Sequence, residues 1–454
     1  MFANWHCRAK YSKDIKMTTN RPTNLDKDQD ALALSQALID DLKKRDLIKT
    51  PRVEAALREV PRHLFLPGVP LEEVYSDRAI SAKQDSDGKW ISSSSQPAIM
   101  AIMLEQLGLE PGHKVLEIGT GPGYNAALMA HIVGETGQVV TVEIDEDLAR
   151  AAREHLVAAG FEQVQVLCAD GGYGAPDAAP FDRIILTVGA PDITPAWWNQ
   201  LKIEGRLVLP LLLRGSMKSI AFEQVRDHLR SLSVTDCGFI PLRGDFALTQ
   251  PNRIQLGPDP GLYLELMDKL PINSEAVYGL LTGPSKDWAA GVDVKAWDVL
   301  GGTLWTWLAL HDPQIHRVVA EGEMIDRNIV PPLLGIDARR KSSATAVLIE
   351  KTGLAALMRP PDQSLPMVTP ELGFLPDSPA NQPFPLFIRQ FGPDKSISQR
   401  LLAQIQAWRA AGSPSSEAIQ VRVYRRDFDY EPSGSEVVLE KEWTKLVIQW
   451  SAAA

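Results

Sequence analysis

The chain has 454 residues, of which 44% are hydrophobic and 23% are charged, and its formal net charge is -10. This length predicts two or more domains, and the composition excludes a disordered, collagen-like or membrane-embedded chain. The negative charge disfavours nucleic acid as a partner because it repels phosphate backbones. Its cysteines, Cys7, Cys168 and Cys237, are far apart, which argues against a disulfide framework or a thiolate zinc site.

The N-terminal region lacks the patterns of membrane insertion or export. No stretch approaches the roughly 20 apolar residues of a membrane span, and the first residues contain no signal-peptide core. We therefore expect no membrane partner and a cytoplasmic location. Residues 1–30 are polar and aperiodic, which predicts a flexible lead-in, with Met17 as an alternative start. Apolar spacing and capping signals then predict helices over residues 31–47, 51–60 and 96–107.

From residue 114 to 213, short β-rich runs alternate with helical stretches. The runs are VLEI, VVTVEI, VQVLCAD and RIILTV, and they are followed by GRLVLPLLL and SIAFEQVR towards the far edge of the expected sheet. Strands that alternate with helices imply right-handed βαβ units and a mostly parallel sheet. We predict an α/β, Rossmann-like domain over residues 31–250.

Residues 251–454 lose this alternation and predict an accessory domain of the α+β class. Seven of the eleven tryptophans lie there, which indicates a separate core. Its last strands are expected at residues 420–424 and 445–450, and residues 359–385 are expected to form an extended, proline-rich loop. Trp305 and Trp307 could form a stacking platform, but burial in a core is the favoured interpretation.

The segment VLEIGTGPGY places a strand before Gly119, Gly121 and Gly123 and a helix after them. Glycines at such a turn let the backbone approach a ligand closely. Three acids lie at the ends of successive expected strands: Glu117 precedes the glycines, Glu143 ends the next strand and Asp170 ends the one after that. An acid at the position of Glu143 suits ribose hydroxyls, whereas Glu117 would repel a pyrophosphate and attract an amino group. The pattern favours S-adenosylmethionine over a dinucleotide; the alternative is that the acids only cap helices or turns.

Several segments together resemble the protein-L-isoaspartate O-methyltransferase family. They are LEIGTGPGY, VVTVEID, CADGGYG, APFDRIILTVGA and IEGRLVLP, flanked by REVPRHLFLP (58–67) and GFIPLRG (238–244), and the resemblance covers roughly residues 38–244. It implies a class I methyltransferase domain that binds S-adenosyl-L-methionine. The residues implied to contact this cofactor are Glu117, Gly119, Thr120, Gly121, Gly123, Glu143, Ile144, Asp170, Gly171 and Thr187.

The resemblance also implies an acceptor site. A carboxylate acceptor is ionised at neutral pH, so methyl transfer needs positioning rather than a strong base. The family carries a serine before Gln-Pro or Ala-Pro, and in this chain Ser95 takes its place as the catalytic residue, with Ser94, Gln96 and Pro97 as substrate contacts. The alternative for Ser95 is that it only caps the helix that follows.

The substrate of the family is a protein with isoaspartyl residues. However, Ser93 and Ser94 replace the family's usual Thr-Ile, and the loop before them is polar. This loop and the long extension resemble a branch that esterifies aspartate in one ribosomally made peptide, where the ester closes to a succinimide. The expected partner is thus a protein or peptide bearing isoaspartate or aspartate, and the oligomeric state is left open. A non-catalytic cofactor-binding scaffold and a tRNA methyltransferase are further alternatives, the latter disfavoured by the acidic balance.

Overall fold

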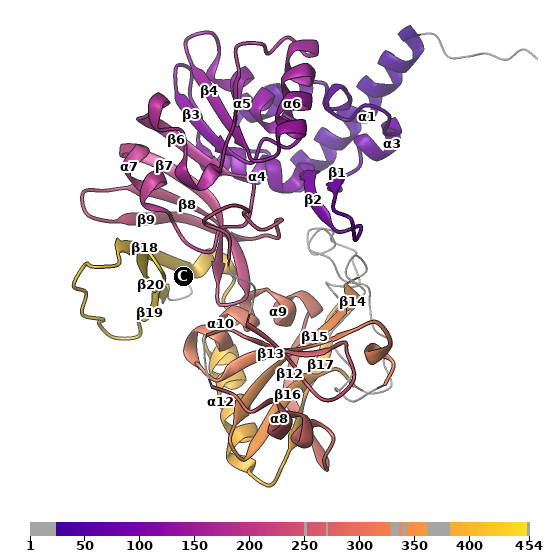
Figure 1. The fold of residues 1–454 in the computed structure, drawn as a ribbon, viewed down its shortest axis with the longest axis vertical. Helices are drawn as coiled ribbons and strands as arrows, with labels where there is room; N and C mark the ends of the chain where they lie inside the picture. The colour runs from indigo at the N-terminus through magenta and orange to yellow at the C-terminus, as the bar shows by residue number, and fades with distance from the viewer. Residues whose placement is uncertain are drawn as a thin grey trace, which may run out of the picture.

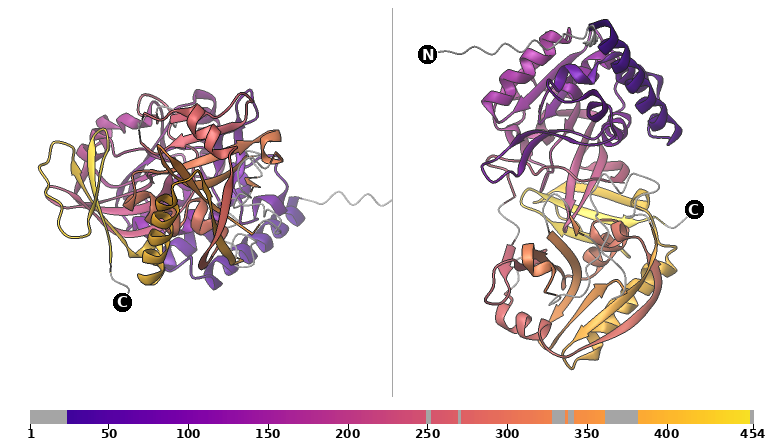
Figure 2. Two further views of the ribbon diagram at one scale, coloured as in Figure 1. Left: turned by 90° about the horizontal axis from the view of Figure 1, so that it is seen from below. Right: turned by 90° about the vertical axis from the view of Figure 1, so that its right-hand side faces the viewer.

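The computed structural model describes residues 24–248, 252–268, 271–327, 336–337, 342–360 and 382–451. Figures 1 and 2 show two lobes, each built around its own β-sheet. We call residues 24–248 the first domain, residues 252–410 the second domain and residues 416–451 the C-terminal segment. In the described part of the chain, no helix combines the length and the apolar character needed to cross a bilayer.

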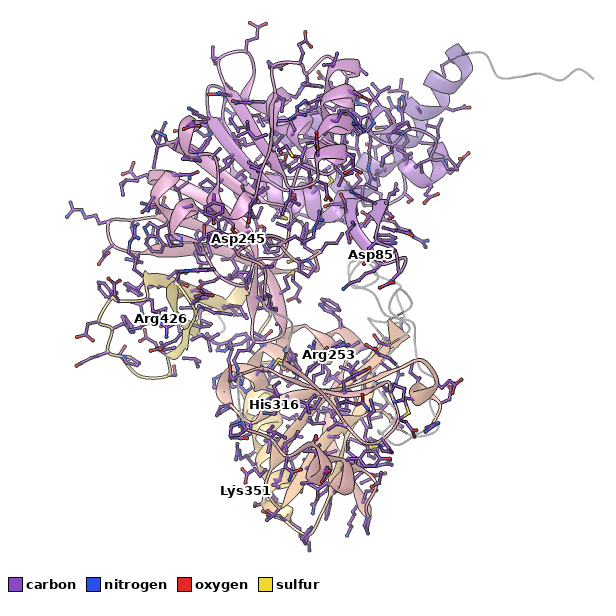
Figure 3. All side chains as sticks on the ribbon, in the orientation of Figure 1. Asp85, Asp245, Arg253, His316, Lys351 and Arg426 are labelled. Atoms are coloured by element: carbon purple, nitrogen blue, oxygen red, sulfur yellow. The ribbon has the colours of Figure 1, made fainter. Side chains whose placement is uncertain are left out.

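The N-terminal region of the first domain is helical, as expected. Its elements are α1 (Asn24–Lys44), α2 (Pro51–Glu59), η1 (Arg62–Phe65), α3 (Leu71–Val74), β1 (Ile80–Gln84), β2 (Trp90–Ser94) and α4 (Pro97–Leu107). The three predicted helices correspond to α1, α2 and α4, although α1 begins inside the expected lead-in. The Thr50 hydroxyl accepts from the backbone of Val53 and caps α2. Strands β1 and β2 form a hairpin that projects towards the second domain, with Asp85 near its tip (Figure 3).

The central sheet of the first domain is mixed. Its strands are β3 (Lys114–Ile118), β4 (Gln138–Glu143), β5 (Gln165–Cys168), β6 (Phe181–Leu186), β7 (Leu201–Leu213), β8 (Ser216–Gln224) and β9 (Leu229–Asp236). Its helices are α5 (Tyr124–Val133), α6 (Glu146–Ala158), α7 (Pro195–Gln200), η2 (Gly171–Tyr173) and η3 (Pro176–Ala178).

The predicted α/β fold is confirmed, but the expected mostly parallel sheet holds only for the five strands in the order β5-β4-β3-β6-β7. Strands β8 and β9 are antiparallel because short turns join them to their predecessors, and a short turn cannot connect parallel neighbours.

The C-terminal segment extends this same sheet. Strands β18 (Ile419–Arg425), β20 (Thr444–Trp450) and β19 (Val437–Glu440) continue it beyond β9. Both predicted terminal strands are therefore present, but residues 251–454 do not share one sheet as the expected grouping implied. The physical reason is that β9 would otherwise leave its backbone groups unpaired, and β18 covers that edge. Figure 2 shows these yellow strands at the junction of the two lobes.

The second domain is of the predicted α+β class. Its strands are β10 (Asn252–Gln255), β11 (Leu262–Leu266), β12 (Ser285–Val294), β13 (Ile315–Glu321), β14 (Ile336–Asp337), β15 (Ser342–Glu350), β16 (Gly353–Met358) and β17 (Phe384–Phe391). Its helices are α8 (Ser274–Leu281), α9 (Ala296–Leu300), α10 (Thr303–His311), η4 (Gly322–Ile325) and α12 (Lys395–Ala410), and η6 (Ser416–Ala418) leads into the C-terminal segment. The described pairings of this sheet are antiparallel. Most of the expected proline-rich loop, residues 361–381, lies outside the described residues.

The turn between β7 and β8 joins the two domains. Arg214 is almost completely buried and donates to Asp268 (2.7 Å), while the Trp305 indole donates to the Arg214 carbonyl (3.0 Å). A methyl group on Gly215 would lie 2.6 Å from the Met267 sulfur, so the turn fits closely against the second domain. Trp305 is fully buried at this joint, as the favoured interpretation predicted.

Candidate active site

The carboxyl ends of the parallel strands gather the predicted cofactor residues. Strand β3 lies between β4 and β6, so the chain crosses the sheet in opposite directions on the two sides of β3. Ligands of such sheets bind at this point, outside the carboxyl ends of the strands. The glycine turn (residues 119–123) follows β3, Glu143 ends β4, Asp170 follows β5 and Thr187 follows β6. The structure thus brings together residues that are up to 70 positions apart in the chain.

The glycine turn has a backbone that side chains would obstruct. Gly119 has φ +99°, and a methyl group there would lie 2.7 Å from the Thr187 hydroxyl. Gly121 has φ +51°, and a methyl group there would lie 3.2 Å from the Ser93 carbonyl oxygen. The Thr187 hydroxyl donates to the Gly119 carbonyl at 2.5 Å. The turn is therefore enclosed by the end of β6 on one side and by the serine loop (residues 92–95) on the other.

Glu143 is held by the backbone around it. Its carboxylate accepts from the N–H of Gly121 (3.0 Å), of Ile144 (3.0 Å) and of Asp145 (3.3 Å). Burial raises its pKa, and these hydrogen bonds oppose the shift. Arg243 lies 3.8 Å from Glu143 and pairs with Asp145 at 2.6 Å. The carboxylate is thus fixed at the strand end where ribose hydroxyls were expected.

Glu117 lies beneath the glycine turn. Its carboxylate is fully buried and accepts from the Thr141 hydroxyl (2.6 Å) and the Asn125 amide (2.8 Å). Burial raises the pKa of Glu117 to about 7, and the nearby Glu143 adds to the shift. The Thr120 hydroxyl is 2.7 Å from that of Thr141. Both carboxylate oxygens of Glu117 therefore have protein partners, and these hydrogen bonds stabilise the structure beneath the glycine turn.

Asp170 follows the carboxyl end of β5. One of its oxygens accepts from the Gly172 N–H (2.8 Å) and the other from the Asp245 N–H (2.7 Å). The carbonyl of Gly171 accepts from the buried Trp197 indole at 2.9 Å. These bonds tie the turn after β5 to α7 and to the segment that follows β9.

One buried cation, Arg62, supports the serine loop. Its side chain is 1% exposed and donates to the carbonyl oxygens of Val74, Ser76, Arg78 and Ser95 and to the Ser94 hydroxyl. Burial lowers its pKa. Arg62 lies in the motif of residues 58–67, but the sequence does not reveal this role, because its partners lie 12 to 33 residues further along the chain.

Ser95 does not cap the following helix. The N-cap of α4 is Gln96, whose side chain makes no capping bond, and the Ala98 N–H instead donates to Asp77 at 2.9 Å. Asp77 is a second residue that sequence analysis missed. Among the residues that the structure describes, no hydrogen bond uses the Ser95 hydroxyl, and Ser95 is half-buried. The capping alternative therefore loses its support.

The neighbours of Ser95 are less accessible. Ser94 and Gln96 are each 3% exposed, and Pro97 is buried as well. The Gln96 amide donates to the Asp77 carbonyl at 3.2 Å. In this structure these three predicted substrate contacts support the loop, and Ser95 is the member of the set that reaches the surface.

Comparisons with known proteins identify relatives of the first domain. The family model described as protein-L-isoaspartate(D-aspartate) O-methyltransferase matches residues 33–246. A protein-L-isoaspartate O-methyltransferase of Methanopyrus kandleri is 38% identical over 218 residues, which are 48% of this chain and 94% of the relative. That of Thermotoga maritima is 42% identical over 171 residues, which are 37% of this chain and 53% of the relative.

Two solved structures can be placed beside these relatives. A protein-L-isoaspartate O-methyltransferase with 23% identity covers 87% of this chain and 98% of its own, with a TM-score of 0.47. One from Plasmodium falciparum, in complex with S-adenosyl-L-homocysteine, has 18% identity, covers 46% of this chain and 98% of its own, and gives a TM-score of 0.41. The sequence match over nearly the whole of the Methanopyrus relative confirms the resemblance found in the motifs. The chain belongs to the protein-L-isoaspartate O-methyltransferase family.

Proposed function

We propose that the first domain transfers a methyl group from S-adenosyl-L-methionine to the carboxylate of an isoaspartyl residue in a protein or peptide. The observation that carries this proposal is the contact between the two halves of the site. A methyl group on Gly121 would lie 3.2 Å from the Ser93 carbonyl, so the glycine turn and the serine loop touch directly. A donor held at the turn would therefore lie beside an acceptor held at the loop.

The residues present fit this donor. Positions 119 and 121 leave the backbone open where any side chain would collide with its surroundings. Glu143 and Asp170 supply carboxylates at neighbouring strand ends, which suits hydroxyl groups and positive charge. We expect the glycine turn, Glu143 and Asp170 to hold the donor, and Glu117 to position the turn from beneath it.

The reaction requires little acid–base chemistry from the chain. When bound, S-adenosyl-L-methionine supplies a methyl group on a positively charged sulfur. The acceptor carboxylate is ionised at neutral pH, so an oxygen–carbon bond forms as the carbon–sulfur bond breaks, and no proton moves. The protein must orient the carboxylate. We expect the Ser95 hydroxyl to donate to one carboxylate oxygen, and Arg62 holds the loop that carries Ser95.

The test uses the full chain, methyl-labelled S-adenosyl-L-methionine and a short isoaspartyl peptide, with the matching aspartyl peptide as a control. We expect label on the isoaspartyl peptide. Ser95→Ala should lower kcat/KM about tenfold, as expected for one lost hydrogen bond to a charged group, without changing the melting temperature. Ser396→Ala, which removes an exposed hydroxyl bonded to Asp394 in the second domain, is the matched control and should leave kcat/KM unchanged. Absence of label on the isoaspartyl peptide would overturn the proposal.

A second candidate is a dedicated peptide aspartate methyltransferase. It is favoured by the way the extension is joined to the first domain, since three of its strands complete the methyltransferase sheet. The same assay separates the candidates. Rapid turnover of the isoaspartyl peptide supports repair, whereas turnover of aspartyl peptides alone supports the dedicated enzyme. If calorimetry detects no binding of S-adenosyl-L-methionine, the non-catalytic scaffold replaces both.

A further inference from the structure

The C-terminal segment reaches the edge of the active site. The backbone N–H of Trp443 donates to Asp192 at 2.7 Å, and the Thr444 hydroxyl donates to the same carboxylate. Asp192 is 3% exposed and follows β6 in the loop that begins at Thr187. The Lys441 ammonium donates to the Leu212 carbonyl at 2.9 Å. Trp443 is thus fixed to the first domain although it lies about 200 residues beyond the family match.

The Trp443 ring continues a row of aromatic side chains. Its centroid is 5.2 Å from that of Phe246, and Phe246 is 4.9 Å from Tyr173 in an edge-to-face arrangement. A methyl group on Gly172 would lie 2.0 Å from the Phe246 ring, so this ring rests directly on the backbone of the turn after β5. The row therefore connects the C-terminal segment to the turn that contains Asp170 and Gly171.

Phe246 belongs to a short strap, residues 243–246, that crosses two strand ends. Arg243 pairs with Asp145 after β4 at 2.6 Å, and the Asp245 N–H donates to Asp170 after β5 at 2.7 Å. The Tyr173 hydroxyl donates to the Asp245 carboxylate at 2.8 Å. Figure 3 shows Asp245 near the junction with the C-terminal segment. The strap therefore holds the strand ends that carry the donor-binding acids.

We propose that Trp443 is a positioning residue for the methyl donor: by packing on Phe246 it holds the strap across β4 and β5 and thereby fixes Asp170. This inference rests on the proposed function, because it assumes that the donor binds at these strand ends. It adds that donor affinity depends on the C-terminal segment, outside residues 33–246 that the family model matches. The C-terminal segment is then part of the catalytic unit rather than an appendage.

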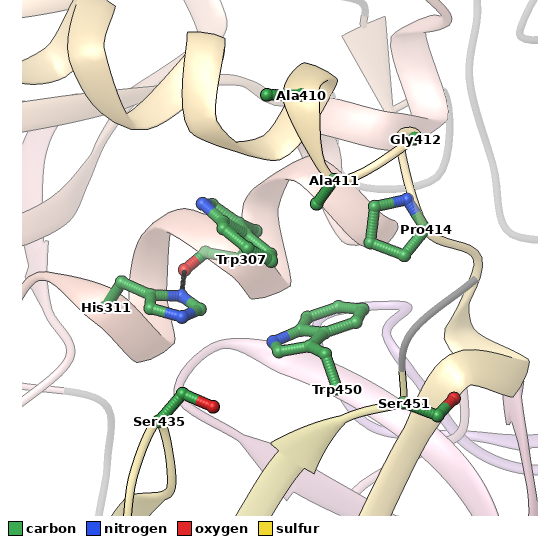
Figure 4. Close-up of a pocket in the computed structure, with 9 residues that line it drawn as sticks. All are labelled: Trp307, His311, Ala410, Ala411, Gly412, Pro414, Ser435, Trp450 and Ser451. Atoms are coloured by element: carbon green, nitrogen blue, oxygen red, sulfur yellow. Dashed lines mark hydrogen bonds between the residues drawn. The ribbon is translucent and has the colours of Figure 1, made fainter.

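The opposite end of β20 offers a matched control. Trp450 is the last residue of the strand that Trp443 immediately precedes, but it packs against Trp307 (5.4 Å between ring centroids), and Trp307 in turn stacks on His311 (4.2 Å). These three side chains line a separate cavity of about 490 Å³ (Figure 4). Replacing Trp450 removes an indole from the other end of this segment without touching the strap.

The experiment measures binding of S-adenosyl-L-homocysteine by calorimetry and the KM values of donor and isoaspartyl peptide, in the full chain. Trp443→Ala should weaken S-adenosyl-L-homocysteine binding and raise the donor KM roughly fivefold to tenfold, the equivalent of a lost aromatic pair. The kcat and the peptide KM should change less than twofold. Trp443→Phe should recover most of the affinity, and Trp450→Ala should retain all of it. If Trp443→Ala does not fold, Trp443→Leu replaces it.

Three results would overturn the inference: unchanged donor affinity in the Trp443 variants, a change in the peptide KM alone, or an equal loss in Trp450→Ala. Failure of the wild-type chain to bind S-adenosyl-L-homocysteine is a different outcome. It would reject the proposed function itself, and with it the role assigned to Trp443.

Discussion

The two halves of the active site are built in different ways. The donor half consists of strand ends within residues 114–187, and most of its hydrogen bonds join a side chain to a backbone group a few residues away or on the neighbouring strand. The acceptor half is one loop. The buried Arg62 donates to the Ser95 carbonyl of this loop, and Asp77 accepts from the backbone of Ala98 at the start of α4. This difference predicts that donor binding depends mainly on backbone conformation, whereas acceptor alignment depends on a long-range polar network.

The largest expected effect is in the donor half, on substitution of Gly119. Gly119→Ala places a methyl group 2.7 Å from the Thr187 hydroxyl and 3.0 Å from Val188, so the turn must move. We expect donor affinity to fall at least 100-fold, measured by calorimetry. Gly134→Ala is the matched control, because Gly134 also has positive φ (+65°) but has open space around it. Both variants carry the strain of a side chain at positive φ, on the order of 1 to 3 kcal/mol, but only Gly119→Ala adds a collision.

An equal loss of affinity in the two glycine variants would show that strain, and not the shape of the turn, controls donor binding. Gly134 lies outside the glycine turn, so that result would mean that the local shape of the donor half does not determine donor affinity. Thermal unfolding of both variants supplies the check that each is folded at the assay temperature.

The next effect also concerns the donor half. It is the pH dependence of the free energy of unfolding that the buried Glu117 should cause. The pKa of Glu117 is raised from 4.5 to about 7, so the folded chain holds this proton more tightly than the unfolded chain. Stability from this group is complete below about pH 4.5 and is lost as the pH rises to about 7, a difference of about 3 kcal/mol. Urea unfolding at pH 5 and pH 8 should show this loss in the wild type and not in Glu117→Gln.

The exposed Glu135 provides the control for that measurement. Glu135→Gln should keep the pH profile of the wild type. If Glu117→Gln keeps it too, the buried carboxylate does not titrate in this range and the assignment of its pKa is wrong.

The sequence predicts the α/β fold of the first domain and the gathering of the donor-half residues at the strand ends. The strand-turn-helix rhythm and the spacing of Gly119, Glu143 and Asp170 are local patterns, and the structure gathers these residues as expected. The pattern could not show that both oxygens of Glu117 are occupied, since Thr141 and Asn125 carry no signal of their own. It also predicted a mostly parallel sheet, because an apolar run such as residues 207–213 does not reveal the direction of the neighbouring strand.

Longer-range features were beyond local patterns. The return of β18 to β9 joins Arg422 to Arg230, almost 200 residues apart, and depends on which sheet edge is left unpaired. The hydrogen bonds by which Arg62 holds the serine loop are also beyond local patterns, because they join residues far apart in the chain. A lone arginine between Pro61 and His63 resembles many surface arginines until its partners are placed around it.

The smallest expected effect comes from a substitution that should change the acceptor half alone. Arg62→Lys keeps the charge but loses the planar fork that reaches five acceptors at once. We expect the free energy of unfolding to fall by about 2 kcal/mol, because buried carbonyl groups lose their donors. Turnover of the isoaspartyl peptide should fall severalfold, while the affinity for S-adenosyl-L-homocysteine stays within twofold of the wild type.

Arg58→Lys is the matched control for this substitution. Arg58 lies in the same motif, but its partners Asp40 and Glu54 are on the surface, so its replacement should change stability by less than about 1 kcal/mol. A parallel loss of donor affinity and turnover in Arg62→Lys would mean that the serine loop also shapes the glycine turn through the contact between Ser93 and Gly121. The two halves would then act as one unit, since a change in the loop would be transmitted to the donor through the backbone.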